Sequence, residues 1–91
     1  MPQRPDPQIA LGEVIYERRE ELELSQEEVA LAAGSSQGRI SEIECGDNPS
    51  FGLAGRIARA LGWSHVELVR RVEEREKDQP KPADGGQPSG D

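Results

Sequence analysis

One stretch near the middle of the chain, SQEEVALAAGSSQGRISEIE from Ser25 onward, limits the possible folds more than any other segment. Ser25 and Glu28 form a capping box, because the serine hydroxyl can accept from a free backbone N–H while the glutamate reaches back to the N–H of the cap. Gly34 accepts the positive φ that ends a helix, and Ser35 or Ser36 can cap the helix that follows. The stretch therefore predicts two short helices that meet at a tight turn.

Helical spacing and stop signals continue on both sides of this stretch. Apolar residues recur at steps of three and four over residues 8–22, which predicts a first helix. The turn signal Gly-Asp-Asn-Pro at 46–49 precedes two more predicted helices, at about 51–61 and from Ser64 to about residue 76. The last of these opens on a second capping box, with Glu67. Strand alternation is absent from the sequence, so we predict an all-α fold, a compact bundle of five helices.

The two ends of the chain differ in composition from residues 9–76, which we expect to form the single domain. Residues 1–8 contain three prolines and are expected to form a flexible arm. Residues 77–91 contain three prolines, three glycines and almost no apolar residues, so they are expected to form a disordered tail. The 91 residues include one each of Phe, Tyr and Trp, so they suffice for one small domain with a core of Leu, Ile, Val and Ala.

Several functional classes find little support in the sequence. The single cysteine, Cys45, permits no internal disulfide or zinc site, and no acid–base pair, phosphate loop or metal-ligand set suggests an enzyme. No apolar run approaches the about 20 residues that span a bilayer, and the N-terminus lacks the apolar region of a signal peptide. We therefore expect a cytoplasmic protein that is not an enzyme and has no membrane partner, cofactor or small-molecule ligand.

The predicted helix pair also meets the packing needs of a helix-turn-helix, with Ala30 small enough for a close crossing and Val29, Ile40 and Ile43 apolar enough to join the helices. The chain resembles the lambda-repressor-like, Cro-type helix-turn-helix domains of the XRE family over about residues 9–70. The matching residues are LG at 11–12 with Ile15 and Arg19, LSQEEVA at 24–30, Gly34, IS at 40–41, IE at 43–44 with Gly46, NPS at 48–50, and IARALG at 57–62. The resemblance implies a five-helix fold and sequence-specific binding to double-stranded DNA, usually as a dimer, by a transcriptional regulator of bacterial or phage type.

The resemblance also implies roles for residues around the second helix of the motif, at about 36–45. Base edges in the major groove would be read by residues at its start and on its outer face: Ser36, Gln37, Gly38, Arg39, Ser41 and Glu42. Phosphates would be contacted by Gln26, Asn48, Ser50 and Phe51. A structural ion pair would join Arg19 to Glu44.

Four of the base-reading candidates have alternative interpretations. Gln37 can pair with adenine through both groups of its amide, or it is an ordinary exposed residue at a helix start. Gly38 either lets the backbone approach DNA or leaves a reading position empty. Arg39 suits a guanine or a phosphate, or it forms a salt bridge with Glu42 or another nearby acid. Glu42 accepts from a cytosine amino group, rejects wrong sites, or has no role in DNA binding.

The charge distribution limits how such a domain could bind DNA. The net charge is −7, and residues 25–48 contribute −4, because Arg39 is the only basic residue among five acidic ones. Phosphate contacts would depend on Arg39, on neutral donors and on helix starts, so we expect weak binding by a monomer and a homodimer on two half-sites. The candidates for the dimer surface are Trp63, Val66, Val69 and Val72, with core packing as the alternative for Trp63.

The acidic segment also supports a different function for the same fold. A protein-interaction module, such as an antitoxin or an accessory regulator, could bind another protein through this acidic face. Gln26, Gln37 and Arg39 on one predicted face favour DNA, whereas the −4 charge of residues 25–48 favours a protein partner.

Overall fold

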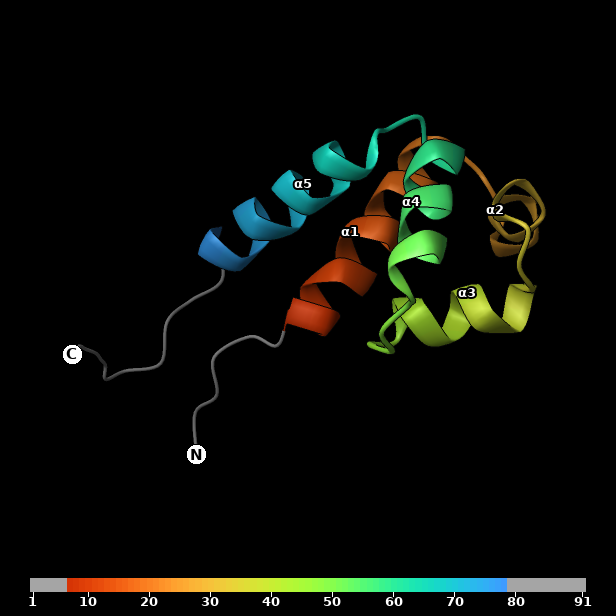
Figure 1. The fold of residues 1–91 in the computed structure, drawn as a ribbon, viewed down its shortest axis with the longest axis horizontal. Coiled ribbons are helices and arrows are strands. Elements are labelled where there is room, and N and C mark those ends of the chain that lie inside the picture. The colour runs from red at the N-terminus through yellow and green to blue at the C-terminus, as the bar shows by residue number, and fades with distance from the viewer. Residues whose placement is uncertain (1–6, 79–91) are drawn as a thin grey trace.

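The computed structural model describes residues 7–78, and these residues form five helices (Figure 1). The helices are α1 (Pro7–Glu21), α2 (Gln26–Ala33), α3 (Gln37–Glu44), α4 (Phe51–Ala60) and α5 (His65–Asp78). Each bound lies within two residues of its prediction, and the described residues include no strand. The predicted all-α, five-helix fold is therefore confirmed.

The first and last helices extend slightly beyond the predicted domain. Residues 7–8, expected in the arm, belong to the first turn of α1. Proline is tolerated there because its missing N–H would have had no partner within the helix. Residues 77–78, expected in the tail, continue α5, and Lys77 in its last turn is favoured by the helix dipole. The remainder of the predicted arm, residues 1–6, and of the predicted tail, residues 79–91, lies outside the described residues.

The turn between α2 and α3 forms as its local signals predict. Ser25 Oγ accepts from the N–H of Glu28 at 3.0 Å, and the Glu28 carboxylate accepts from the N–H of Ser25 at 2.7 Å, so the capping box is complete. Gly34 ends α2 in the left-handed conformation, with a φ of 67°. Ser36, rather than Ser35, caps α3, because its hydroxyl accepts from a backbone N–H in the first turn of that helix.

The second predicted capping box uses its glutamate differently. Ser64 Oγ accepts from the N–H of Glu67 at 3.0 Å, so the serine caps α5 as expected. The Glu67 carboxylate accepts from Arg71 and Arg70 one turn further along the helix. The hydrogen bond from Arg71, followed by that from Arg70, lowers the pKa of Glu67. Charge-assisted hydrogen bonds are stronger than neutral ones, which explains why the glutamate turns toward the arginines.

The core lies among α1 to α4 and is completed by α5. Its largest fully buried side chains are those of Ile15, Val29, Ile40, Ile43, Ile57, Leu61 and Leu68. α1 packs against α3 and α5, α2 against α3 and α4, and α4 against α5. In Figure 1, α3 lies along one edge of the bundle, away from α5. Its outer side therefore stays exposed, at Gln37, Gly38 and Glu42.

Two arginines fasten the ends of helices to their neighbours. Arg18 on α1 donates from Nε to the carbonyl oxygen of Leu61, just beyond α4, at 3.0 Å. Arg56 on α4 donates from Nε to the carbonyl oxygen of Ala33, the last residue of α2, at 2.8 Å. The final carbonyls of a helix have no donors within the helix, so these cations satisfy them. Both arginines contribute to the fold and thereby hold the helix-turn-helix in place.

Candidate nucleic-acid interface

A chain of hydrogen bonds connects the start of α3 to a buried ion pair. Gln37 Nε2 donates to Gln26 Oε1 at 2.6 Å, and Gln26 Nε2 donates to Glu44 Oε1 at 2.9 Å. Glu44 in turn accepts from Arg19, at 2.7 Å from Nε and at 3.1 Å from Nη2. The structure thus brings together a base-reading candidate, a phosphate candidate and both members of the structural ion pair.

The Arg19–Glu44 pair is shielded from solvent and joins α1 to the end of α3. The side chains are only 9% and 7% exposed. Arg19 also donates from Nη1 to the carbonyl oxygen of Leu24 at 2.8 Å, which fixes the loop before α2. The hydrogen bond to Glu44 is the main cause that raises the pKa of Arg19. The bidentate geometry holds Glu44 in the orientation that accepts from Gln26.

The only basic residue of α2 and α3, Arg39, lies against acidic residues of its own chain. Its Nη1 is 2.5 Å from Asp47 Oδ2 and 3.2 Å from Glu42 Oε1. Its Nη2 donates to the carbonyl oxygen of Asn48 at 3.1 Å. The hydrogen bond to Asp47 is the main cause that raises the pKa of Arg39, and the same bond lowers the pKa of Asp47. The salt-bridge interpretation of Arg39 therefore describes this structure, with Asp47 as a partner that sequence reasoning did not name.

The other base-reading candidates differ in whether they are hydrogen-bonded, exposed or half-buried. Ser36 uses its hydroxyl to accept from the N–H of Arg39 at 3.2 Å. A Cβ on Gly38 would meet nothing within 4 Å, so packing does not require glycine there and the position is open at the surface. Ser41 is half-buried beside the core residue Ile40.

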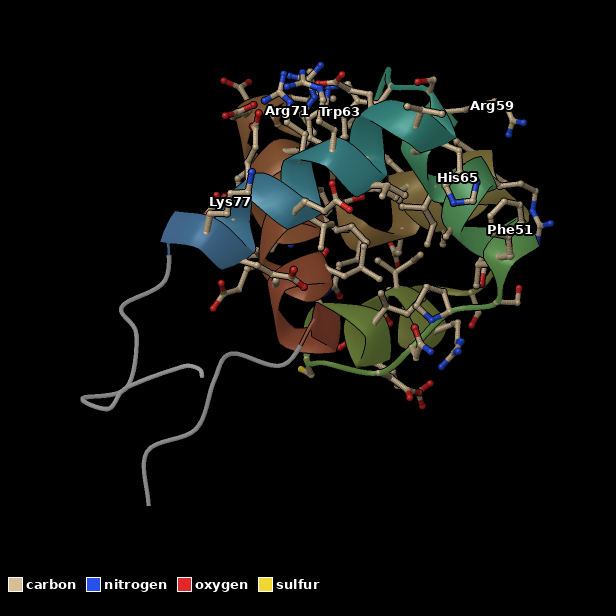
Figure 2. The ribbon with its side chains drawn as sticks, turned by 60° about the vertical axis from the view of Figure 1, so that its left-hand side comes forward. Phe51, Arg59, Trp63, His65, Arg71 and Lys77 are labelled. Atoms are coloured by element: carbon tan, nitrogen blue, oxygen red, sulfur yellow. The ribbon has the colours of Figure 1, made fainter. Side chains whose placement is uncertain are left out.

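The phosphate candidates beyond α3 lie where the chain enters α4. Ser50 Oγ accepts from the N–H of Leu53 at 3.1 Å and caps that helix. Phe51 is 81% exposed, yet its ring packs against the imidazole of His65 with a centroid distance of 4.1 Å and a tilt of 42° between the rings. His65 is half-buried. Figure 2 shows Phe51 and His65 side by side where α4 meets the start of α5. Phe51 therefore belongs to a contact between helices as well as to the end of the α3–α4 loop.

An apolar hollow of about 450 Å³, formed by Phe51, His65, Val66 and Val69, lies on this side of the molecule, with Arg70 and Glu73 at its rim. Val66 is 76% exposed and Val69 46% exposed. The four candidates for the dimer surface are thus divided, because Trp63 and Val72 pack against the core instead. Figure 2 shows Trp63 with Arg71 on a different side from Phe51 and His65.

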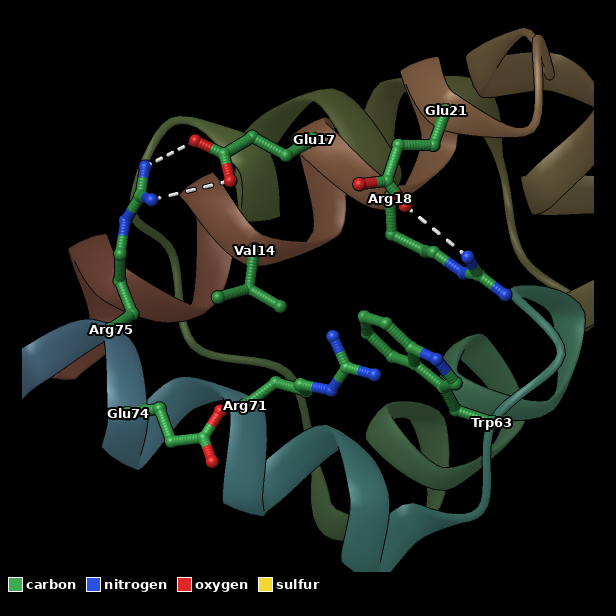
Figure 3. A pocket seen from close by; sticks show the side chains of 8 residues that line it. All are labelled: Val14, Glu17, Arg18, Glu21, Trp63, Arg71, Glu74 and Arg75. Carbon is green, nitrogen blue, oxygen red and sulfur yellow. Dashed lines mark hydrogen bonds and ion pairs between the residues drawn. The ribbon is translucent and has the colours of Figure 1, made fainter.

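Trp63 lies between two arginines in a small pocket between α1 and α5 (Figure 3). The guanidinium carbons of Arg18 and Arg71 are each 5.0 Å from the centre of its ring, a distance at which a cation is attracted to the face of an aromatic ring. The rim of this pocket, about 160 Å³ in volume, includes the ion pair between Arg75 on α5 and Glu17 on α1. These contacts favour the core-packing interpretation of Trp63.

Two further features follow from the described part of the chain. Residues 7–78 contain no group of three or more His, Cys, Asp or Glu side chains placed to hold a metal ion. The five helices in that range are also too short or too polar to cross a membrane.

The sequence and the fold of this chain are similar to those of known helix-turn-helix proteins. A family model described as Helix-turn-helix, HTH_3, matches residues 15–68. An uncharacterized HTH-type transcriptional regulator of Methanothermobacter thermautotrophicus is 45% identical over 62 residues, which cover 67% of this chain and 90% of that protein. The uncharacterized HTH-type transcriptional regulator y4dJ of Sinorhizobium fredii is 46% identical over 57 residues, or 62% of this chain and 74% of that protein. The crystal structure of the clp gene regulator ClgR from Corynebacterium glutamicum superposes with a TM-score of 0.76 and 26% identity, covering 82% of this chain and 81% of that one.

Proposed function

The chain belongs to the XRE family of helix-turn-helix domains, and from this premise we propose that it is a sequence-specific, DNA-binding transcriptional regulator. The exposed outer side of α3 would enter the major groove, and the start of α2 would contact the phosphate backbone. The base-reading residues would be those predicted from the sequence, with Gln37 as the principal one. The phosphate contacts would come from Gln26 and from the loop and cap residues Asn48, Ser50 and Phe51.

The observation that carries this proposal is the hydrogen-bonded chain from Gln37 through Gln26 to Glu44. A long polar side chain loses rotamer entropy when it binds, and a side chain that is already held loses less. Gln37 Oε1 has no partner among the described residues, and its Nε2 keeps a second hydrogen. Those two groups match the donor and acceptor of adenine in the major groove.

We also propose that the regulator binds as a homodimer through the apolar hollow on α4 and α5. Adjacent exposed apolar side chains, here Phe51, Val66 and Val69, are typical of protein interfaces. In a dimer with a two-fold axis, the same surface of both copies forms the interface. If residue i of one copy contacts residue j of the other, then residue j of the first copy contacts residue i of the second. Arg70 and Glu73 at the rim carry opposite charges and could pair between two such copies.

Selection of binding sites from random double-stranded DNA tests the proposed function. The wild-type protein should enrich one sequence at low salt. Gln37→Ala should lose the preference at one or two base pairs, and the lost bidentate contact corresponds to about 1–3 kcal/mol of discrimination against the wrong base. Leu31→Ala, an 85% exposed residue at the other end of α2 from Gln26, is the matched control and should keep the preference. A wild-type protein that enriches no sequence would contradict the proposal.

A second function, binding to a protein through the acidic face, is favoured by one observation. Arg39 is already engaged by Asp47 and Glu42, so the surface around α3 presents negative charge. This alternative predicts that a basic peptide shifts the backbone NMR signals of α3 at low salt, while random and selected duplexes shift none of them.

A further inference from the structure

The Arg39 side chain bridges the outer face of α3 and the loop that leads to α4. It is the only basic residue between Arg19 and Arg56. Two of its nitrogens are committed, because Nη1 contacts Asp47 at 2.5 Å and Glu42 at 3.2 Å while Nη2 donates to the Asn48 carbonyl at 3.1 Å. The three charged side chains together carry one net negative charge.

The Asp47 carboxylate is itself oriented by the backbone. Its Oδ1 accepts from the N–H of Asn48 at 3.0 Å, and the N–H of Asp47 donates to the carbonyl oxygen of Glu42 at 2.9 Å. The aspartate is thus held over the end of α3, where its second oxygen meets Arg39. Asp47 is therefore already positioned to pair with Arg39 in the protein without bound DNA.

Binding of Arg39 to DNA would expose this cluster to the phosphate backbone. If the guanidinium moved to a phosphate, Asp47 and Glu42 would lose their counter-charge close to other phosphates, and like charges repel. That cost arises wherever Arg39 leaves the acids for a phosphate. It does not arise where Arg39 keeps Asp47 and donates two hydrogen bonds to one base from Nε and the remaining Nη2 hydrogen, as it can to guanine.

Building on the proposed function, we propose that Asp47, assisted by Glu42, determines specificity by holding Arg39 away from the phosphate backbone. Arg39 then reads a base through Nε and the remaining Nη2 hydrogen while Nη1 stays with Asp47. The acids repel phosphates in every complex, but only complexes with wrong sequences also lose the phosphate contact that a released Arg39 would make, which raises the ratio of specific to random affinity.

The substitution Asp47→Asn tests this role, because asparagine keeps the Oδ1 acceptor for the Asn48 N–H and removes only the charge. The affinity for a random duplex should rise about fivefold at low salt, and the affinity for the selected sequence should rise less. The slope of log affinity against log salt for the random duplex should steepen by about 0.9, which corresponds to one additional phosphate contact. Thermal unfolding of the variant confirms that it is folded, and Glu42→Gln provides a second test on the same cation.

Two controls separate a local effect from a general change in charge. Glu21→Gln removes one exposed negative charge on α1, at a residue that belongs neither to the proposed DNA contacts nor to the proposed dimer interface, and should leave the ratio of specific to random affinity unchanged. In an Arg39→Ala background, Asp47→Asn should have no more effect than Glu21→Gln. If the wild type prefers a sequence and neither Asp47→Asn nor Glu42→Gln lowers that ratio, the inference is overturned and the proposed function stands. If the wild type prefers no sequence, the proposed function itself fails.

Discussion

A Cβ atom on Gly12 would lie 2.6 Å from the carbonyl oxygen of Glu44 and 2.6 Å from that of Ile43. Side chains do not approach backbone oxygens this closely, so only glycine lets α1 cross the last turn of α3 at this distance. The same crossing brings Arg19 on α1 to the carboxylate of Glu44. The position of α3 therefore depends on Gly12 and Arg19, two residues of α1 that lie outside the helix-turn-helix itself.

We expect Gly12→Ala to lower the free energy of unfolding by about 1–3 kcal/mol, the usual cost of overpacking. Both neighbouring oxygens belong to the backbone, so the strain is relieved only if α1 and α3 move apart. Chemical denaturation followed by circular dichroism measures the change. Gly38→Ala is the matched control, since a Cβ there meets nothing within 4 Å, and it should stabilise α3 by up to about 1 kcal/mol. Stabilisation by both substitutions would show that the close crossing is not tight.

Glu44→Gln should lower the free energy of unfolding by about 3 kcal/mol, because it leaves the Arg19 charge, 9% exposed, with only the exposed Glu20 as a counter-charge. The comparison is Glu42→Gln on the same helix. Its ion pair with Arg39 is exposed, so the loss should stay below about 1 kcal/mol. Urea titrations of the two variants give both values. Similar losses would mean that burial of the Arg19–Glu44 pair contributes little.

The pH dependence of Asp47 follows from its contact with Arg39. The hydrogen bond from Arg39 lowers the pKa of Asp47 below its usual value near 3.8. A carboxylate whose pKa is lower in the folded state stabilises the fold above the unfolded pKa. That stabilisation is lost as the pH falls through the folded pKa, here below about 3.8. NMR titration of the side-chain carboxyl carbon should show this lowered midpoint, and Arg39→Ala should raise it part of the way, because the N–H of Asn48 still donates to the carboxylate. A midpoint that is the same in both proteins would show that the pair does not form in solution.

The helices were predictable because each boundary depends on a few adjacent residues. Ser25, Glu28 and Gly34 carry their signals within single turns of the chain, and all three act as predicted. The spacing of the sequence predicts a small residue at a close crossing within the helix-turn-helix, at Ala30. The contact between Gly12 and the end of α3 depends instead on how α1 packs, which local spacing does not determine.

The candidate site was predictable as a set of positions and less so as a set of contacts. The sequence and the family resemblance placed Gln37 and Arg39 on the exposed side of α3. The pairing of Arg39 with Asp47 depends on the path of the loop after α3. The contact between the rings of Phe51 and His65 depends on the packing of α4 against α5. The role of Phe51 as a phosphate contact stays a prediction.

Trp63 is the only tryptophan, so its fluorescence reports on the pocket between Arg18 and Arg71. Because it packs against the core while remaining partly exposed, Trp63→Ala should lower the free energy of unfolding by about 2 kcal/mol, less than the 3–5 typical of a fully buried aromatic. Arg71→Ala should cost under about 1 kcal/mol, as expected for an exposed cation over a ring, and should shift the emission of Trp63. Neither substitution should change self-association. Loss of self-association in Trp63→Ala, with stability unchanged, would instead make this residue a dimer anchor.

Val66→Asp should weaken self-association of the chain by at least about a hundredfold, because it places a charge in the centre of the proposed interface, where no partner is available to it. Val66 is 76% exposed within one copy, so the free energy of unfolding of the monomer should change by less than about 0.5 kcal/mol. Leu31→Asp, at an 85% exposed position on α2, is the control and should leave association intact. Sedimentation equilibrium measures both variants beside the wild type. A wild type that remains monomeric at tens of micromolar would contradict the proposed dimer, and equal weakening by the two substitutions would show that added negative charge, rather than the hollow, is responsible.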